Sequence, residues 1–92
     1  MKKLDIIPTN QFKRDLKLAN KRGLNIKLLQ EIIDLLANKK SLPWKNRDHA
    51  LHGDFEGYRE CHVAPDWLLI YAVDFEHSIL VLSRTGTHAD LF

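Results

Sequence analysis

The sequence contains a single cysteine, so its fold cannot depend on an internal disulfide bond. Such scarcity fits a reducing compartment. No apolar stretch approaches the roughly 18–20 residues that a membrane-spanning helix needs. The opening residues, MKKLDIIPTN, lack the apolar core of about 7–15 residues that an export signal contains. We therefore expect a cytoplasmic protein that does not associate with membranes.

The sequence also lacks internal repeats, low-complexity runs and linker-like stretches. Its 92 residues match the size of one small domain, and we expect residues 1–92 to form that domain. A domain of this size buries only about 60–65% of the surface of its unfolded chain. One modest hydrophobic core is therefore expected.

Negative charge is scarce in the first half of the chain. Residues 1–47 carry 12 Lys or Arg and 4 Asp or Glu, whereas residues 48–92 carry 2 and 8. The halves therefore have net charges of +8 and −6, although the whole chain has only +2. This asymmetry suggests a surface that faces a polyanion. Helices also carry lysine on solvated faces without any such partner, so charge alone leaves both explanations open.

Apolar periodicity predicts two helices in the first half of the chain. Phe12, Leu16 and Ala19 recur at helical spacing and predict a helix over residues 10–22. A wider apolar stripe predicts a second helix over residues 26–38, which we expect to cover a sheet. The polar face of the first helix carries basic residues at regular spacing: Lys13, Lys17 and Lys21, with Arg14 alongside.

The remaining elements are expected to be strands and one long loop. A short strand is predicted over residues 2–7, and residues 38–57 read as a polar loop of a length that is often functional. Three strands follow, over residues 58–64, 67–73 and 79–84. In the last strand, alternation predicts that Leu80, Leu82 and Arg84 share one face. The order βααβββ predicts an α+β fold, an antiparallel sheet with two N-terminal helices packed on one face.

Side chains that can carry chemistry lie near the ends of these elements, where antiparallel pairing lets them gather at one edge of the sheet. They are His49, His62, Asp66, Trp67, Arg84, His88 and Phe92. Histidine exchanges protons near neutral pH because its ordinary pKa is about 6.5. Residue type alone makes Trp67 a core residue and Phe92 an anchor for the C-terminal tail.

Histidines combined with arginine can cleave RNA without a metal ion. One group takes the proton of a ribose 2′-OH, which attacks the adjacent phosphorus, and another protonates the departing 5′-oxygen. Arginine stabilises the charge that develops on the phosphorane, and an aromatic ring can stack on an unpaired base.

Two other kinds of site are also considered. His49, His52, His62 and His88 offer four nitrogen ligands to zinc, although their spacing is not diagnostic. Cys61 lies on the strand face opposite His62 and so lacks an obvious base that would make it a nucleophile.

Several segments together resemble the YafQ branch of the RelE/ParE toxin superfamily. They are KRDLKLANKRG, DHALHGDFEGYRECHVAPDWLLIYAVD and LSRTGTHADLF, and the similarity covers nearly the whole chain. The resemblance implies a RelE-like microbial RNase fold and the toxin of a type II toxin–antitoxin system. It further implies a ribosome-dependent endonuclease that cuts mRNA in the ribosomal A site and is neutralised by a DinJ-like antitoxin.

The resemblance also implies roles for single residues. His49, His62, Asp66 and His88 fall on catalytic positions, and Trp67, Arg84 and Phe92 fall on substrate-binding positions. Neither a cofactor nor a metal ion is expected. Lysines of the first helix would face ribosomal RNA or an acidic antitoxin. A ParE-like module that acts only by binding a protein is the alternative, and it would not need the histidines.

Overall fold

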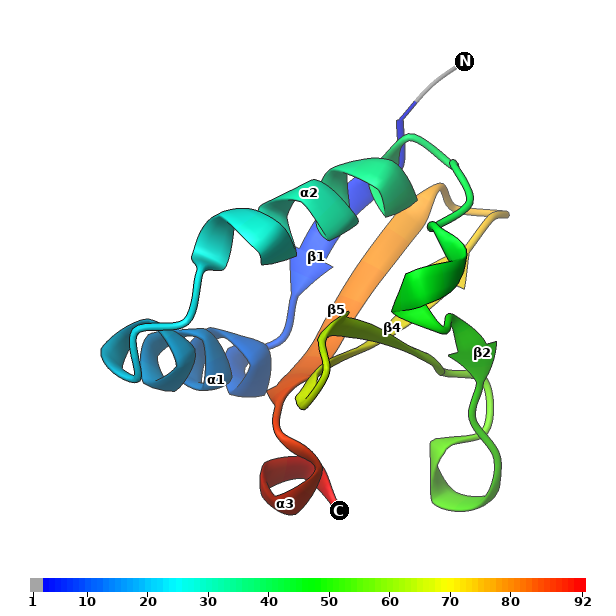
Figure 1. Ribbon diagram of the computed structural model, residues 1–92. Coiled ribbons are helices and arrows are strands. Elements are labelled where there is room, and N and C mark those ends of the chain that lie inside the picture. Colours follow the sequence, from blue (N-terminus) through cyan, green and yellow to red (C-terminus); the bar gives the residue numbers. More distant parts are fainter. Residues whose placement is uncertain (1–2) are drawn as a thin grey trace.

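The computed structural model describes residues 3–92 and contains a five-stranded sheet with two helices packed on one face (Figure 1). The elements in chain order are β1 (Asp5–Pro8), α1 (Asn10–Lys21), α2 (Ile26–Ala37), a 3-10 turn (Trp44–Asn46), β2 (His49–Ala50), a 3-10 turn (Gly53–Phe55), β3 (Arg59–Ala64), β4 (Trp67–Asp74), β5 (Ile79–Gly86) and α3 (His88–Leu91). The predicted α+β class and the βααβββ order of the longer elements are confirmed. Two short elements, β2 and α3, are added to that order.

The sheet has the strand order β1-β5-β4-β3-β2 and mixed directions. β3, β4 and β5 pair antiparallel as predicted, and the added β2 pairs antiparallel with β3, but β1 pairs parallel with β5. The chain reaches β5 only after two helices and three strands, and the alternation within one strand does not encode the direction of so distant a partner. The predicted strand over residues 2–7 begins at Lys2, outside the described residues. The observed strand includes Pro8, which an edge strand tolerates.

The two long helices form because local caps and an apolar face agree. The Thr9 side chain accepts a hydrogen bond from the Phe12 N–H at the start of α1, and Asn25 does the same for Lys27 in α2. Apolar faces of both helices then pack on the sheet. The buried residues of this core are Leu4, Phe12, Ala19, Leu29, Ile32, Leu36, Ala37, Cys61, Val63, Trp67, Leu69, Tyr71, Leu80 and Leu82.

The opposite face of the sheet carries only a small apolar cluster. Leu68, Ile70 and Leu91 are buried there, packed against Leu51, Phe55 and Tyr58. The segment over residues 38–57 is more ordered than a plain loop, because it contains two 3-10 turns and β2, and its Leu51 and Phe55 pack on this face. The same face receives α3 from the C-terminus, at the foot of the molecule in Figure 1.

A β-bulge in β5 changes the face of the sheet on which Arg84 lies. Tyr71 pairs with Leu82, but the preceding Ile70 pairs with Arg84, so Ser83 is an extra residue. Arg84 therefore shares a face with Ile70, and the prediction that it shares one with Leu82 is wrong. Strict alternation failed because a bulge shifts every later side chain to the other face.

None of the helices in residues 3–92 combines the length and the apolar character that crossing a membrane requires.

Candidate active site

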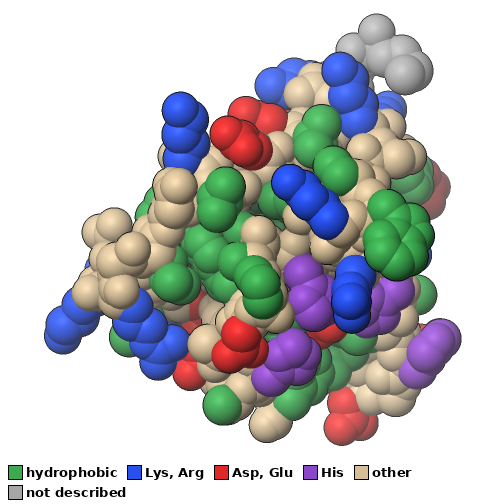
Figure 2. Space-filling view, in the orientation of Figure 1, with side chains coloured by type: hydrophobic (Ala, Val, Ile, Leu, Met, Phe, Trp, Pro, Cys, Tyr) green, Lys and Arg blue, Asp and Glu red, His purple; other side chains and the backbone are tan. Residues whose placement is uncertain are grey.

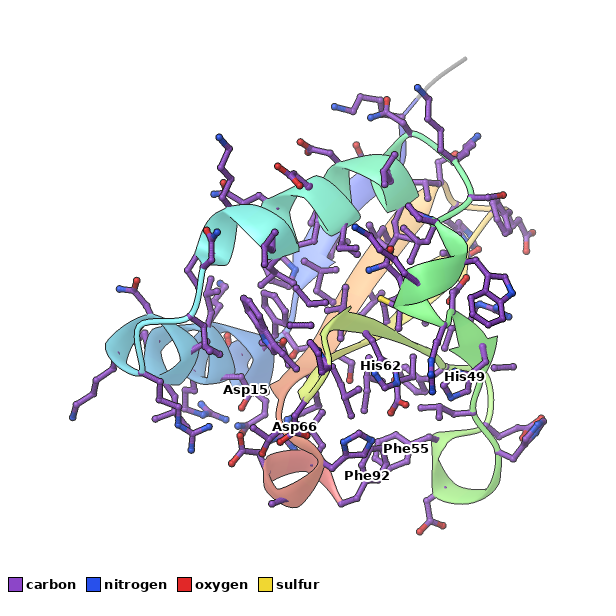
Figure 3. All side chains as sticks on the ribbon, in the orientation of Figure 1. Asp15, His49, Phe55, His62, Asp66 and Phe92 are labelled. Carbon is purple, nitrogen blue, oxygen red and sulfur yellow. The ribbon has the colours of Figure 1, made fainter. Side chains whose placement is uncertain are left out.

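The strand register arranges the site residues in two rows on the face that lacks the long helices. The first row crosses four strands through His49, Glu60, Ile70 and Arg84. The second runs from His62 through Leu68 to Gly86, immediately before α3. Without the bulge, Arg84 would not belong to the first row. Figure 3 shows His49 and His62 on this side of the sheet.

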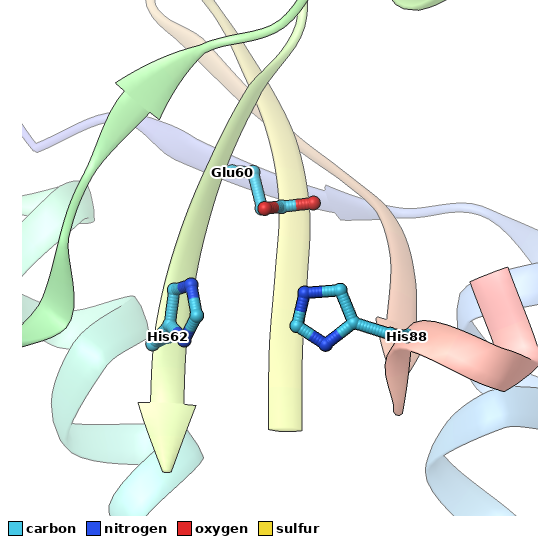
Figure 4. Close-up of side chains that lie close together, drawn as sticks. All are labelled: Glu60, His62 and His88. Atoms are coloured by element: carbon cyan, nitrogen blue, oxygen red, sulfur yellow. The ribbon is translucent and has the colours of Figure 1, made fainter. Parts of the chain in front are cut away.

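Glu60, His62 and His88 form the centre of the site (Figure 4). The rings of His62 and His88 have centroids 5.9 Å apart. One ligand-type atom from each of the three residues lies within 4.8 Å of the others. Glu60 is only 5% exposed. A buried carboxylate is costly without compensating charge or hydrogen bonds, and the adjacent imidazoles can supply both when they are protonated.

His49 approaches the same carboxylate from β2. Its Nε2 lies 3.4 Å from Oε1 of Glu60, and its Nδ1 lies 2.7 Å from the carbonyl oxygen of Arg47. A carbonyl oxygen only accepts hydrogen bonds, so Nδ1 carries the hydrogen and Nε2 is directed at Glu60. Figure 2 shows histidine side chains gathered with Lys or Arg side chains on this face.

Asp48 fixes the segment that carries His49. Its Oδ1 accepts hydrogen bonds from the Tyr71 hydroxyl at 2.5 Å and from Nε of Arg59 at 3.3 Å. Burial and the bond to Asp48 raise the pKa of Tyr71, so the phenol stays protonated and acts as a donor. β2 is thereby fastened to both β3 and β4.

Asp66 orients His88. Its Oδ1 accepts hydrogen bonds from Nδ1 of His88 at 3.0 Å and from the backbone N–H of the same residue at 3.2 Å. The hydrogen bond from the imidazole is the main reason that the pKa of Asp66 is lowered. Because Nδ1 is committed to the carboxylate, Nε2 of His88 is the atom left to exchange protons.

The C-terminal tail is held in place from both of its sides. Thr87 and Asp90 form a capping box at the start of α3, and Asp90 also pairs with Nη1 of Arg22 at 2.7 Å. Phe92 meets Phe55 edge to face with ring centroids 5.5 Å apart, at the lower edge of Figure 3. The tail that carries His88 is thus attached to α1 on one side and to the 3-10 turn after β2 on the other.

Arg84 is paired inside the protein. Its Nε lies 2.7 Å from Oδ2 of Asp15 and its Nη2 lies 3.2 Å from Oδ1. Burial opposes ionisation of Asp15, but hydrogen bonds from Arg84, Gln11 and the Thr85 N–H outweigh it and lower the pKa of Asp15. Among the nitrogens of the guanidinium, Nη1 makes no hydrogen bond within residues 3–92.

Trp67 lies in the main core and is 3% exposed. Its Nε1 donates to Oγ1 of Thr85 at 2.9 Å, and that hydroxyl donates to the carbonyl oxygen of Leu68 at 2.7 Å. The ring therefore presents no open face for stacking on a base. It supports the ends of β4 and β5 next to Asp66, and its substrate-binding role stays a prediction.

The four-histidine zinc site suggested by the sequence is not assembled within residues 3–92, and Cys61 lies in the core. The metal-type cluster around the site joins Glu60 to His62 and His88 and includes neither His49 nor His52. His52 is exposed and lies 3.5 Å from Glu56. Cys61 is fully buried, and burial raises the pKa of its thiol to about 12, which disfavours the reactive thiolate.

Sequence reasoning missed Glu60, Asp15 and Phe55. Glu60 had a signal, because it alternates with His62 on the same strand face. Asp15 had none, since its partner Arg84 is 69 residues away. Phe55 lies in the segment predicted to be a loop.

Comparison with known proteins identifies the family. A family model described as "Bacterial toxin of type II toxin-antitoxin system, YafQ" matches residues 4–92. The chain belongs to the YafQ toxin family.

Individual YafQ relatives are similar along almost the entire chain. The mRNA interferase toxin YafQ of Escherichia coli K12 is 44% identical over 89 residues, which cover 96% of this chain and 95% of the relative. YafQ in the crystal structure of the E. coli DinJ-YafQ toxin-antitoxin complex has a TM-score of 0.88 and 43% identity, with 98% of both chains covered. A metal-bound toxin from Helicobacter pylori has a TM-score of 0.91 and 39% identity, covering 97% of this chain and 99% of the other.

Proposed function

We propose that this YafQ-family toxin is a metal-independent endoribonuclease that cleaves mRNA in the ribosomal A site. The observation that carries the proposal is the facing pair His62 and His88, whose ring centroids lie 5.9 Å apart beside the buried carboxylate of Glu60. Two imidazoles at this separation can serve opposite sides of one phosphodiester. The name mRNA interferase of the E. coli relative supports the same activity.

The proposed reaction is an acid–base attack by the ribose 2′-OH on the adjacent phosphorus. One of the two imidazoles removes the 2′-OH proton and the other protonates the departing 5′-oxygen. Asp66 keeps Nδ1 of His88 as a hydrogen-bond donor, so Nε2 performs the transfer. Glu60 places a negative charge next to His62 and His88, which offsets the positive charge that an imidazole gains with a proton. His49 contacts the same carboxylate, with its Nε2 3.4 Å from Glu60.

Arg84 binds the scissile phosphate in this mechanism through its unengaged Nη1. Asp15 fixes Nε and Nη2 of the guanidinium, so the group is presented in a single orientation at the end of the first row. Phe92, packed edge to face on Phe55, shapes the neighbouring surface for a base.

Two partners follow from the proposed function. A DinJ-like antitoxin neutralises the toxin, which is supported by the E. coli DinJ-YafQ complex. The ribosome and its mRNA are the target, which is supported by the exposed lysines of α1. A cytoplasmic location agrees with these partners and stays a prediction.

Metal independence can be tested at the same cluster. The Glu60, His62 and His88 ligand atoms are close enough to hold a metal ion, and a solved H. pylori relative is metal-bound. An ion there would occupy the imidazole lone pairs that proton transfer needs. The proposal therefore expects full activity from toxin that is stripped with chelator and dialysed before it meets the ribosomes, and inhibition by added zinc. Activity that is lost on stripping and restored by a metal other than Mg²⁺ would make the protein a metal-dependent nuclease.

The deciding experiment compares wild-type protein with His88→Ala in a purified translation system, with mRNA 5′ ends mapped by primer extension. His77→Ala is the matched control, because His77 also pairs with an aspartate, Asp74, at 2.8 Å but lies in a turn outside the site. We expect ribosome-dependent cuts at A-site codons for wild type and His77→Ala. Loss of one proton-transfer group should slow His88→Ala by about 100-fold or more.

Other outcomes have equally clear meanings. Cuts by wild type without ribosomes would indicate a freestanding nuclease. Growth arrest that persists in a folded His62→Ala, His88→Ala double variant would favour the ParE-like binding module over the enzyme.

A further inference from the structure

Trp44 is an aromatic side chain that the mechanism above does not use. It is 90% exposed, which is unusual because tryptophan is mostly buried in folded proteins. It begins the 3-10 turn Trp44–Asn46, which follows Pro43. Nothing in the core accounts for this side chain, since the main core packs without it.

The turn that carries Trp44 is fixed to the strand that carries His62. Asn46 is 5% exposed, and its Nδ2 donates to the backbone carbonyl oxygen of His62 at 2.7 Å. A buried hydrogen bond of this kind holds the turn at a defined position relative to the site. The exposed ring of Trp44 therefore projects from a rigid support.

Arg47 follows the turn in an unusual conformation. Its φ is 47° and lies in the left-handed region, which is uncommon for a residue other than glycine, asparagine or aspartate. Its carbonyl oxygen accepts the hydrogen bond from Nδ1 of His49. The guanidinium is exposed and forms no ion pair within residues 3–92. Strain of this kind is concentrated at functional sites.

The same residues connect two open hollows to the catalytic histidines. One hollow, of about 720 Å³, is lined by Trp44, Arg47 and His49. The other, of about 550 Å³, is lined by Lys45, Arg47 and His62. Both volumes fall in the range of roughly 300–1,000 Å³ that is typical of small-ligand sites.

The charge around these hollows is positive. Lys45 and Arg47 are exposed, whereas Asp48, which also lines the larger hollow, is committed to Arg59 and Tyr71. An exposed aromatic ring beside unpaired cations is the combination that binds single-stranded nucleic acid, through base stacking and phosphate contacts.

We propose that Trp44 and Arg47 form a nucleotide subsite next to the scissile position. The base of a flanking, unpaired RNA nucleotide stacks on Trp44, and its phosphate contacts Arg47, with Lys45 on the neighbouring wall. RNA is favoured over a protein partner because His49 lines one hollow and His62 the other, so a strand bound at the catalytic pair has its neighbouring nucleotides beside them. The inference rests on the proposed ribonuclease function.

The binding experiment uses the fluorescence of Trp44 as a direct reporter. The chain has two tryptophans, and the other, Trp67, is buried. A single-stranded RNA hexamer with 2′-O-methyl riboses cannot be cleaved and is titrated into wild-type protein. Stacking is expected to quench Trp44, and Trp44→Ala is expected to weaken binding by about fivefold or more, measured by anisotropy of a labelled hexamer. Phe75→Ala is the matched control, because Phe75 is 70% exposed in the turn between β4 and β5.

The cation is tested with Arg47→Gly, since glycine accepts a φ of 47° without strain. Lys39→Gly is its control, because Lys39 is also an exposed cation with a positive φ, 60°. Arg47→Gly is expected to weaken RNA binding and reduce its salt dependence, whereas Lys39→Gly is not. In ribosome-dependent cleavage, Trp44→Ala is expected to raise KM and leave kcat nearly unchanged.

The outcomes separate this inference from the proposed function. If wild type cleaves mRNA and Trp44→Ala matches it in KM and in hexamer affinity, the subsite is wrong and the nuclease stands. If the hexamer quenches Trp44 and Trp44→Ala loses affinity but no RNA is cut, the subsite stands and the nuclease is wrong. If Trp44→Ala weakens only antitoxin binding, the surface is a protein-docking site and the inference is overturned.

Discussion

At the scale of single residues, the centre of the site is a buried carboxylate rather than a histidine. Glu60 is almost fully buried. Nε2 of His49 lies 3.4 Å from its Oε1, and ring nitrogens of His62 and His88 lie within 4.8 Å of its carboxylate. In the proposed mechanism, a negative charge at Glu60 stabilises the positive charge of an imidazole that has accepted a proton, without contact with the substrate.

Glu60→Gln keeps the shape of the side chain and removes the charge. We expect kcat to fall by about 10- to 100-fold, because protonated imidazole loses its counter-charge, with little change in KM. The measurement is cleavage of programmed ribosomes, with folding checked by circular dichroism. Glu56→Gln is the matched control, since Glu56 also lies near a histidine, His52 at 3.5 Å, but is exposed. Equal activity of both variants with wild type would exclude Glu60 from the mechanism.

At the scale of elements, α1 is the support for the C-terminal part of the site. Asp15 accepts hydrogen bonds from Arg84 and from the Thr85 N–H, and Arg22 pairs with Asp90 in α3. β1 stops at Pro8, opposite Leu82, so the last residues of β5 pair with β4 on one side but have no strand on the β1 side. Asp15 accepts a hydrogen bond from the Thr85 N–H, a backbone donor that would otherwise lack a partner on this side of β5.

Acid should weaken this support. The pKa of Asp15 in the folded protein is lowered below its ordinary value of 3.8, so the unfolded chain binds its proton more readily. The stabilisation is therefore complete above about pH 4 and is lost as the pH falls through the lowered pKa. Hydrogen bonds to a charged group contribute about 1–3 kcal/mol to the free energy of unfolding.

Asp15→Asn tests this by urea unfolding at several pH values. We expect the variant to be less stable than wild type by about 1–3 kcal/mol at pH 7, with a difference that shrinks toward pH 3. Asp5→Asn, at an exposed position of the edge strand β1, is the comparison variant. A difference between Asp15→Asn and wild type that stays constant with pH would contradict the assigned role of the carboxylate.

At the scale of the whole molecule, basic residues predominate in the first half of the chain and acidic residues in the second. The lysines of α1 are exposed on the outer side of a helix whose other side packs on β5. The histidines of the site lie on the opposite face of the sheet, and the Arg84 guanidinium pairs with Asp15 of α1 at the edge between the two. A polyanion can therefore contact α1 and the site from two sides of the same edge.

Replacing Lys13, Lys17 and Lys21 together by glutamine should weaken ribosome binding and flatten its dependence on salt. Each contact between a lysine and an RNA phosphate releases counterions from the RNA. Every such lysine that is lost therefore reduces the steepness of the plot of log affinity against log salt by somewhat less than about 1. The control replaces Lys27, Lys39 and Lys40 by glutamine. These lysines are also exposed, but Lys27 lies in α2 and the other two follow it. Binding is measured by pelleting with ribosomes at several salt concentrations, and equal slopes for both triple variants would refute a role specific to α1.

The sequence by itself determined the long elements and the residue types of the site. Helix ends lie within one residue of their predicted positions, because caps such as Thr9 and Asn25 and the apolar spacing act locally. The sequence also predicted, by motif and by the antiparallel order of β3 to β5, that His49, His62, Asp66 and His88 gather at one edge of the sheet; their catalytic roles stay predictions. Local periodicity and short turns suffice for all of these.

Only the tertiary structure decided the relations that depend on distant segments. The parallel pairing of β1 with β5 and the pairing of Arg84 with Asp15 join residues far apart in sequence, and the bulge at Ser83 depends on how β5 pairs with β4. The charge environment of Glu60 likewise exists only once β2, β3 and α3 meet. Sequence patterns report propensities along the chain, whereas registers, bulges and buried charges are set by which packing of the whole chain leaves the fewest polar groups unsatisfied.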